Sequence, residues 1–389
     1  MSQLNVDTIK KADGTGNLSV PAETGTVVTT ASPSLGRRNM VLNGSMAVAQ
    51  RGTQSTGITT TGFRTVDRFR TSLGTLGTWT EDQSTDAPDE FANSFKLTCT
   101  TADASPAAGD VAYIRYMFEG NELQGLAYGT ASAKDLTLSF WVKSNKTGSA
   151  TVQLLQNDNS SKNISPSYTI SSADTWEYKT ISIPADVAGN IDNDNGPAVS
   201  LIWWLNSGTN FSSGSNQTTW ATYSATDSNA SNLGVGGAIS DYFQITGVQL
   251  EVGSVATPFE HRSYGEELAL CQRYYQSSYN TGVSPGSSVD EFAGSNGGQG
   301  VYHAFGTNVS GGVASSIGSF VTQMRTRPTV TVYDHSGNSG KITTFDSGSS
   351  PTANQSYNAV RQSQRQIIVR TYQSSIFGFE YLYEADAEL

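Results

Sequence analysis

Three histidines, His261, His303 and His335, are the imidazole groups available for catalysis in the 389 residues. A hydrolytic triad needs a histidine beside a nucleophile, and none of the three lies in a nucleophile-elbow or metalloprotease motif. Cleavage of a glycosidic bond needs two neighbouring carboxylates, and no spacing among the 34 acidic residues marks such a pair. These patterns predict a protein that is not an enzyme, with hydrolysis of a surface polysaccharide left as an alternative.

The run Asp192–Gly196 is similar to the start of a calcium-binding loop. Asp192 and Asp194 occupy the first and third positions, where such loops place ligands. The glycine comes one position early, and Trp203 stands at the twelfth position in place of glutamate. The sequence therefore favours a plain turn, with a structural calcium site as the alternative, and it predicts no other cofactor.

Aromatic side chains in polar loops have a different chemistry, because the apolar C–H faces of sugar rings stack on aromatic rings. Two stretches carry such side chains: residues 206–236, which are rich in Ser, Thr and Asn, and the chain from 280 onward. Loops of this kind can vary without disturbing a core, so binding functions concentrate there. We predict carbohydrate contacts at Phe211, Trp220, Tyr223, His303, Tyr333 and His335.

The elements that must position these groups are predicted to be β-strands. Residues 136–143 alternate apolar and polar side chains, with Trp141 on the polar face, where either exposure or a covering layer would fit. Residues 199–205 are apolar on both faces, as a strand at the centre of a sandwich is. Residues 242–252 form the last strand pair. Many short strands with few helical windows predict an all-β chain with a β-sandwich over residues 37–262.

A short helix and a smaller β-domain are predicted to follow. Residues 263–276 give the best helical pattern, with Ser263 as N-cap and Glu266 three residues on. We place a linker helix at 263–279 and a C-terminal β-domain at 280–389. Two apolar stripes could face the chain's own core or another copy of it. The residues that would line such an oligomer interface are Leu268, Cys271, Tyr275, Phe377, Phe379 and Tyr381.

Charge and composition exclude several classes of function. The net charge is −11, and basic residues form no cluster beyond pairs, so nucleic-acid binding is not expected. No apolar run reaches the roughly 18 residues that a membrane span needs, and no signal peptide opens the chain. We therefore expect synthesis in a cytoplasm without export and no membrane insertion. Cys99 and Cys271 cannot form a disulfide framework, and we interpret both as buried apolar side chains.

Residues 1–36 are short β-prone pieces broken by turn signals such as residues 12–17. A segment this short and polar cannot bury a core by itself. We therefore expect it to pack on another copy or on another protein, or to stay extended.

Several stretches resemble bacteriophage tail-fibre proteins. These stretches are RNMVLNGS (38–45), AQRGT (49–53), DRF (67–69), LSFWVKS (138–144), GVQLEVGSVATPFEHR (247–262), YGEELALCQRYY (264–275) and YEADAEL (383–389). Residues 18–26 are similar to short leaders of marine phage structural proteins. The resemblance implies a receptor-binding protein with a carbohydrate-binding-module-like jelly roll. It further implies location on the virion, as a tail fibre or on the capsid surface, and a homotrimer.

The same resemblance implies two partners. The first is a host cell-surface glycan, although the family supplies no defined sugar site. The second is another virion structural protein, which we expect to hold the N-terminal segment, residues 1–36. A capsid fibre or decoration protein is the alternative to a receptor-binding tail fibre.

Overall fold

The computed structural model describes residues 9–10, 17–18, 37–158, 162–289, 301–305, 314–345, 351–373 and 376–389. The chain divides into two compact units, Met1–Arg38 and Asn39–Leu389. In the described part of the first unit, β1 (Ile9–Lys10) and β2 (Asn17–Leu18) pair as antiparallel strands. The rest of the predicted attachment segment lies outside the described residues.

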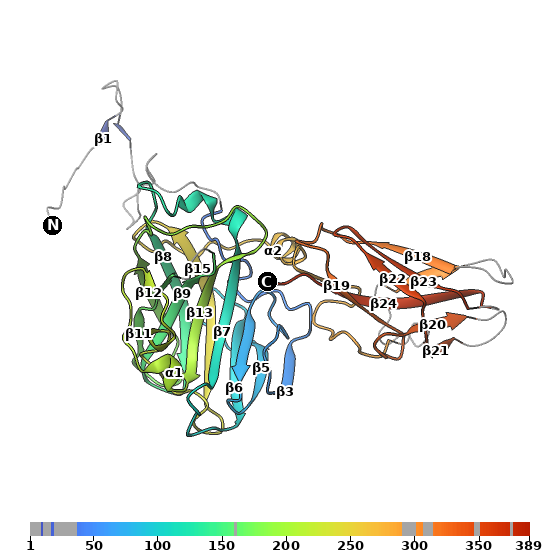
Figure 1. The fold of residues 1–389 in the computed structure, drawn as a ribbon, viewed down its shortest axis with the longest axis horizontal. Helices are drawn as coiled ribbons and strands as arrows, with labels where there is room; N and C mark the ends of the chain where they lie inside the picture. The colour runs from blue at the N-terminus through green and yellow to red at the C-terminus, as the bar shows by residue number, and fades with distance from the viewer. Residues whose placement is uncertain are drawn as a thin grey trace. The chain divides into compact units, whose positions relative to one another are not determined.

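The second unit begins with a β-sandwich of two antiparallel sheets (Figure 1). In the described residues, one sheet has the order β14-β10-β9-β13-β7-β4, with β11 paired to β9. Its strands are β4 (Arg70–Gly74), β7 (Val111–Glu119), β9 (Gly148–Gln156), β10 (Lys162–Ile164), β11 (Ser167–Ile170), β13 (Pro197–Ser207) and β14 (Ala221–Thr222). The other sheet has the order β12-β8-β15-β6-β5-β3. Its strands are β3 (Gln54–Ile58), β5 (Thr78–Ser84), β6 (Ser94–Thr101), β8 (Leu136–Ser144), β12 (Glu177–Ile183) and β15 (Tyr242–Val252). The predicted all-β fold is confirmed.

The alternation of residues 136–143 places the core as the sequence predicts. Leu138 and Phe140 of β8 point inward and are fully buried. Phe140 meets Trp203 of β13 with ring centroids 5.8 Å apart. The neighbouring Trp204 faces the other way and is covered by Phe211 of α1 (Thr209–Ser212), with ring centroids 5.7 Å apart. Residues 199–205 are therefore buried on both faces, as predicted.

The predicted helix is shorter than expected. Helix α2 covers Tyr264–Cys271, and the hydroxyl of Ser263 accepts a hydrogen bond from the backbone N–H of Glu266, which confirms the N-cap. The extension to residue 276 or 279 is wrong, because the chain turns after Cys271 and residues Tyr275–Ser277 form β16, which pairs with the last strand, β24 (Gly378–Asp386). The C-terminal β-domain therefore begins at residue 275 rather than 280.

The C-terminal domain contains two antiparallel sheets in the described residues. The larger one has the order β16-β24-β20-β21, with β17 and β19 also paired to β24, and the smaller one has the order β18-β23-β22. Their further strands are β17 (Tyr302–Phe305), β18 (Ala314–Ser319), β19 (Thr329–Tyr333), β20 (Ile342–Phe345), β21 (Thr352–Gln355), β22 (Ala359–Gln362) and β23 (Gln366–Thr371). A separate core, with Phe379 and Tyr381 of β24 at its centre, lies between these strands. The smaller β-domain is thus present.

Buried ion pairs join the sandwich to the last residues of the chain. The guanidinium of Arg68 contacts the carboxylate of Glu388, and the two side chains are 1% and 3% exposed. Arg51 lies 3.1 Å from Asp386, 3.5 Å from Glu388 and 3.7 Å from Asp67. Arg51, Arg68, Asp67 and Glu388 are buried and paired, which is the condition under which buried charges are tolerated, while Asp386 reaches solvent.

Two tyrosines after α2 complete this contact. The guanidinium of Arg51 lies 3.6 Å from the ring centroid of Tyr275, and that of Arg68 lies 3.4 Å from the ring centroid of Tyr274. We call this cluster the joint. It consists of Gln50, Arg51, Asp67, Arg68, Tyr274, Tyr275, Asp386 and Glu388. Four of the sequence stretches that resemble fibre proteins, 49–53, 67–69, 264–275 and 383–389, therefore meet at one place.

Candidate functional site

The outer face of the sheet formed by β12, β8 and β15 carries a row of hydroxyl and aromatic side chains. Because Leu138 and Phe140 point into the core, their neighbours along β8 point outward. The pairing of β12 with β8 sets these residues side by side as Tyr178–Trp141, Thr180–Ser139 and Ser182–Thr137. This surface is the floor and one side of a groove.

A loop over β15, residues 254–260, forms the opposite wall. The carboxylate of Glu251 accepts hydrogen bonds from the backbone N–H of Thr257 at 2.9 Å and from its hydroxyl at 2.7 Å. The side-chain oxygen of Gln249 accepts one from the backbone N–H of Glu260 at 2.8 Å. Gln249 and Glu251 are buried beneath the loop. The alternation of β15 therefore fixes this wall, because Gln249 and Glu251, two residues apart on one face of the strand, both bind the loop.

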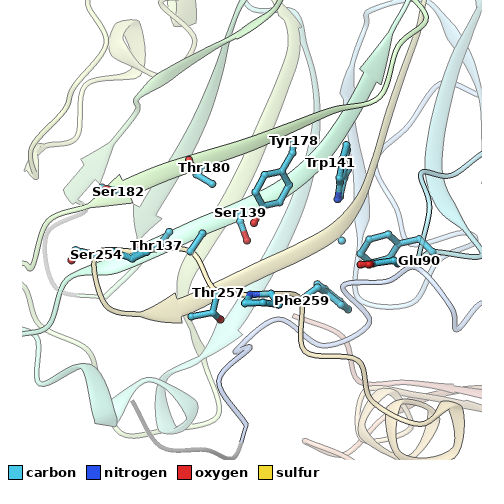
Figure 2. A pocket seen from close by; sticks show the side chains of 15 residues that line it. Glu90, Thr137, Ser139, Trp141, Tyr178, Thr180, Ser182, Ser254, Thr257 and Phe259 are labelled. Carbon is cyan, nitrogen blue, oxygen red and sulfur yellow. The ribbon is translucent and has the colours of Figure 1, made fainter. Parts of the chain in front are cut away.

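The groove has a volume of about 760 Å³, within the range of sites for small ligands. The ring of Tyr178 is 44% exposed and lies 5.3 Å from the ring of Trp141, centroid to centroid. On the other side, the rings of Phe91 and Phe259 lie 5.0 Å apart. Figure 2 shows Tyr178, Trp141 and Phe259 around the groove, with the hydroxyl side chains of Thr180 and Ser182 farther along β12.

Gly247 makes the close approach of these aromatic rings possible. It lies at an irregularity in β15, between Thr246 and Gln249, and its φ of +60° is in the left-handed region. A Cβ atom here would lie 2.7 Å from Cζ of Phe91 and 3.0 Å from Cδ1 of Trp141. Glycine is therefore required for the floor of the groove to keep its shape.

The groove is nearly free of charge. Glu90 is the one carboxylate among its described lining residues, and no lysine or arginine lines it. Lys143 at the end of β8 forms an ion pair with Asp86 at 2.8 Å, and the indole N–H of Trp176 also donates to Asp86. Partial burial raises the pKa of Asp86, but the hydrogen bonds from Lys143 and Trp176 outweigh it and hold the pKa below its usual value. Asp86 is thus ionised at neutral pH, and Lys143 and Trp176 are its partners.

Stacking and hydroxyl hydrogen bonding are the chemistry that such a groove offers. Two carboxylates on either side of a bond are needed for glycoside hydrolysis, and the described lining supplies Glu90 alone. In the part of the chain that the structure describes, no three His, Cys, Asp or Glu side chains are grouped so that they could hold a metal ion. No helix of that part is long and apolar enough to cross a membrane.

The predicted residues of the 206–236 stretch lie elsewhere. The ring of Trp220 is half-buried against Tyr128, and its indole N–H donates to the carbonyl of Pro184 at 2.7 Å. Phe211 covers Trp204, as described above. Tyr223 is 36% exposed and is the most accessible of the three. None of them lines the groove.

The predicted residues of the C-terminal domain are tied to acidic partners. Nδ1 of His303 lies 3.6 Å and Nδ1 of His335 lies 3.4 Å from the buried carboxylate of Glu380. Tyr333 is 9% exposed, and its hydroxyl donates to Glu384 at 2.5 Å. The structure thus groups the two histidines around one carboxylate and places Tyr333 at the edge of the joint.

The Asp192–Gly196 run folds as a turn. The carboxylate of Asp194 accepts a hydrogen bond from the backbone N–H of Gly196 at 2.7 Å, and Asp158 accepts one from the backbone N–H of Asp192 at 2.9 Å. Mutual repulsion of these carboxylates contributes, after partial burial, to a raised pKa of Asp158. Calcium binding stays a prediction.

The predicted oligomer interface needs correction. Four of its six residues are fully buried within their own chain, which leaves them no surface for a second copy: Cys271, Tyr275, Phe379 and Tyr381. Both cysteines are free thiols and buried, as expected. Leu268 is half-buried, and Phe377, at 49% exposure, is the member of the set most open to a neighbour.

Comparison with known proteins finds likeness at the level of structure. No protein-family model matches the chain, and no curated protein matches it. A solved structure of the enzymatically active domain of bacteriophage CBA120 tailspike protein 4 is 14% identical, covers 55% of this chain and 21% of its own, and has a TM-score of 0.28. The chain thus spans about a fifth of that tailspike.

Two carbohydrate-binding modules are similar to a comparable extent. The family 11 module from Clostridium thermocellum is 14% identical over 53% of this chain and 99% of its own, with a TM-score of 0.27. TmCBM61, solved with β-1,4-galactotriose, is 9% identical over 56% of this chain and 99% of its own, with a TM-score of 0.27. At these identities and TM-scores the likenesses assign no function to this chain.

Proposed function

We propose that this protein binds glycans without cleaving them, through the groove between β12 and the 254–260 loop. The observation that carries the proposal is the pair of the half-buried Trp141 ring and the exposed Tyr178 ring above a groove lined with hydroxyls and almost free of charge. Aromatic rings bind the C–H faces of sugars, and serine and threonine hydroxyls bind their hydroxyl groups. Glu90 is the single carboxylate in the described lining, which supports binding rather than hydrolysis.

The sequence resemblance supports a place for this activity on a bacteriophage. We propose that the protein is a virion fibre whose N-terminal segment, residues 1–36, attaches it to another structural protein and whose groove meets host cell-surface glycans. A single sugar site of this kind is weak, and a homotrimer on one particle would raise avidity without new contacts. Light scattering tests the oligomer: three times 41.3 kDa supports a trimer, and a stable monomer at micromolar concentration contradicts it.

Placement on the virion separates the two fibre hypotheses. Electron microscopy of particles carrying a labelled copy of the chain is expected to show the label on the tail. Label on the head would favour the capsid fibre or decoration protein instead.

Binding to a panel of immobilised cell-surface polysaccharides tests the groove. We expect Tyr178→Ala to weaken binding of the intact protein about tenfold, because it removes the exposed ring of the aromatic pair. Tyr223→Ala is the matched control, since it also removes a partly exposed tyrosine, from the 206–236 stretch. Equal loss in both variants, or loss in Tyr223→Ala alone, would contradict the proposal. Release of reducing ends from a bound polysaccharide would favour a hydrolase.

A further inference from the structure

The groove has a direction. Its hydroxyl and aromatic residues follow β8 from Thr137 to Trp141, four residue steps that span about 14 Å. Residues 178–182 of the neighbouring strand β12 pair with these residues one by one. In the direction across the strands, the 254–260 loop closes the groove, because Gln249 and Glu251 hold this loop on β15. A ligand longer than one sugar ring therefore fits along β8 rather than across it.

The two parts of this path offer different contacts. The ring pair of Trp141 and Tyr178 presents aromatic surface, while farther along the path Thr180 and Ser182 of β12 present hydroxyls beside the buried Ser139 and Thr137 of β8. Thr180 and Ser182 are exposed. The hydroxyl of Thr137 donates to the carbonyl of Gly253 and is already used. One sugar ring on the aromatic pair would thus be followed by further units whose hydroxyl groups meet β12.

The charge of the protein bears on the charge of the ligand. The net charge of the chain is −11, and the described lining contains one acidic side chain, Glu90, and no basic one. Lys143, the nearest cation along β8, is paired with Asp86. A uronate, sulfate or phosphate group would find no cation in the groove and would be repelled by the protein as a whole.

We infer that the groove takes an uncharged, linear polysaccharide lying along β8, with one sugar ring on Trp141 and Tyr178 and later units over Thr180 and Ser182. This inference rests on the proposed glycan binding and specifies its ligand. Chain length, rather than one terminal sugar, then sets the affinity.

The charge of the ligand is tested with neutral and anionic members of the polysaccharide panel, each measured at 50 and 500 mM NaCl. We expect the intact protein to bind neutral members, with less than about twofold change in affinity between the two salt concentrations, since no ion pair is screened. Binding confined to anionic members, weakened by salt and still lost in Tyr178→Ala, would overturn the uncharged ligand while leaving glycan binding in the groove intact. Absence of any binding that depends on Tyr178 would overturn both.

The direction of the ligand is tested with fragments of two and six sugar units cut from the polysaccharide that binds. The double variant Thr180→Ala with Ser182→Ala is expected to weaken binding of the six-unit fragment about fivefold, because hydroxyl hydrogen bonds are lost. The two-unit fragment, held at the aromatic pair, should change less than about twofold. Tyr178→Ala should weaken both fragments.

The matched control is Ser167→Ala with Thr169→Ala. It also removes one serine and one threonine hydroxyl, but from exposed positions of β11 in the other sheet. This control should leave both fragments unaffected. Equal effects of the β12 double variant on the two fragments, or no effect on either, would overturn a ligand that lies along β8.

Discussion

The groove and the joint differ in how their polar groups are satisfied. In the joint, Arg68 and Glu388 are almost completely buried and neutralise each other. In the groove, Thr180, Ser182 and the ring of Tyr178 are open to solvent, and charge is nearly absent. The difference separates structure from recognition: a buried ion network holds parts of one chain together, whereas exposed rings and hydroxyls have room for a ligand.

The sequence stretches that resemble fibre proteins contribute more residues to the joint than to the groove. Four of them build the joint, and two, residues 138–144 and 247–262, supply β8 and the loop wall of the groove. The resemblance therefore reports mainly on how the chain is held together. Substitutions in the joint should change stability, and substitutions in the groove should change binding.

The largest effect is expected from Glu388→Ala. This change leaves the guanidinium of Arg68 buried without its carboxylate, and removal of one partner of a buried ion pair costs about 3–5 kcal/mol of unfolding free energy. Urea unfolding of the intact protein measures it. Asp89→Ala removes an exposed carboxylate and should stay within about 0.5 kcal/mol of the unchanged protein. Equal midpoints for the two variants would show that the joint does not stabilise the fold.

The next largest effect is the pH dependence of the unfolding free energy that Asp67 causes. Burial raises the pKa of this carboxyl from 3.8 to about 6, against the opposing effect of Arg51. A carboxyl whose pKa is raised in the folded protein favours folding when protonated. Its contribution is therefore complete below pH 3.8 and is lost as the pH rises through 6.

Asp67→Asn removes this titration. The unfolding free energy of the unchanged protein, relative to that of Asp67→Asn, should fall by about 2 kcal/mol between pH 4 and pH 7.5. The absolute offset includes the altered hydrogen bond to Gln50, so the slope with pH is the test. A difference that is constant over this range would contradict the raised pKa.

A smaller effect on stability, coupled to binding, is expected from Gly247→Ala. The left-handed φ and the contact with Phe91 together should cost about 1–3 kcal/mol, and displacement of the rings should weaken glycan binding. Gly57→Ala is a control with a similar φ of +67° and no atom within 4 Å of the new Cβ. If both variants bind equally well, the aromatic floor of the groove does not contribute to recognition.

Much of the fold could be predicted from the sequence because alternation decides which side chains face a core. It placed Leu138, Phe140 and Trp203 inside and left Trp141 on the outer face. The end of α2 could not be predicted, because Tyr275 continues the helical stripe and its position depends on pairing with a strand more than 100 residues later.

The groove could not be found by the same reasoning. Trp141 and Tyr178 each stand on the polar face of an alternating strand, which was the available signal. Whether such a face is covered depends on the 254–260 loop, which Gln249 and Glu251 hold through side-chain contacts that alternation does not reveal. Loop composition pointed instead to Trp220, whose ring turned out to pack on Tyr128.

The most direct test of the central claim is hydroxyl-radical footprinting of the intact protein with and without a bound polysaccharide, read residue by residue by mass spectrometry. The ligand should protect Trp141 and Tyr178 and leave Tyr223 and the half-exposed Tyr372 of the C-terminal domain oxidised as before. Protection of Tyr223 or Tyr372 with unchanged oxidation of Trp141 and Tyr178 would contradict the account and move the glycan site out of the groove.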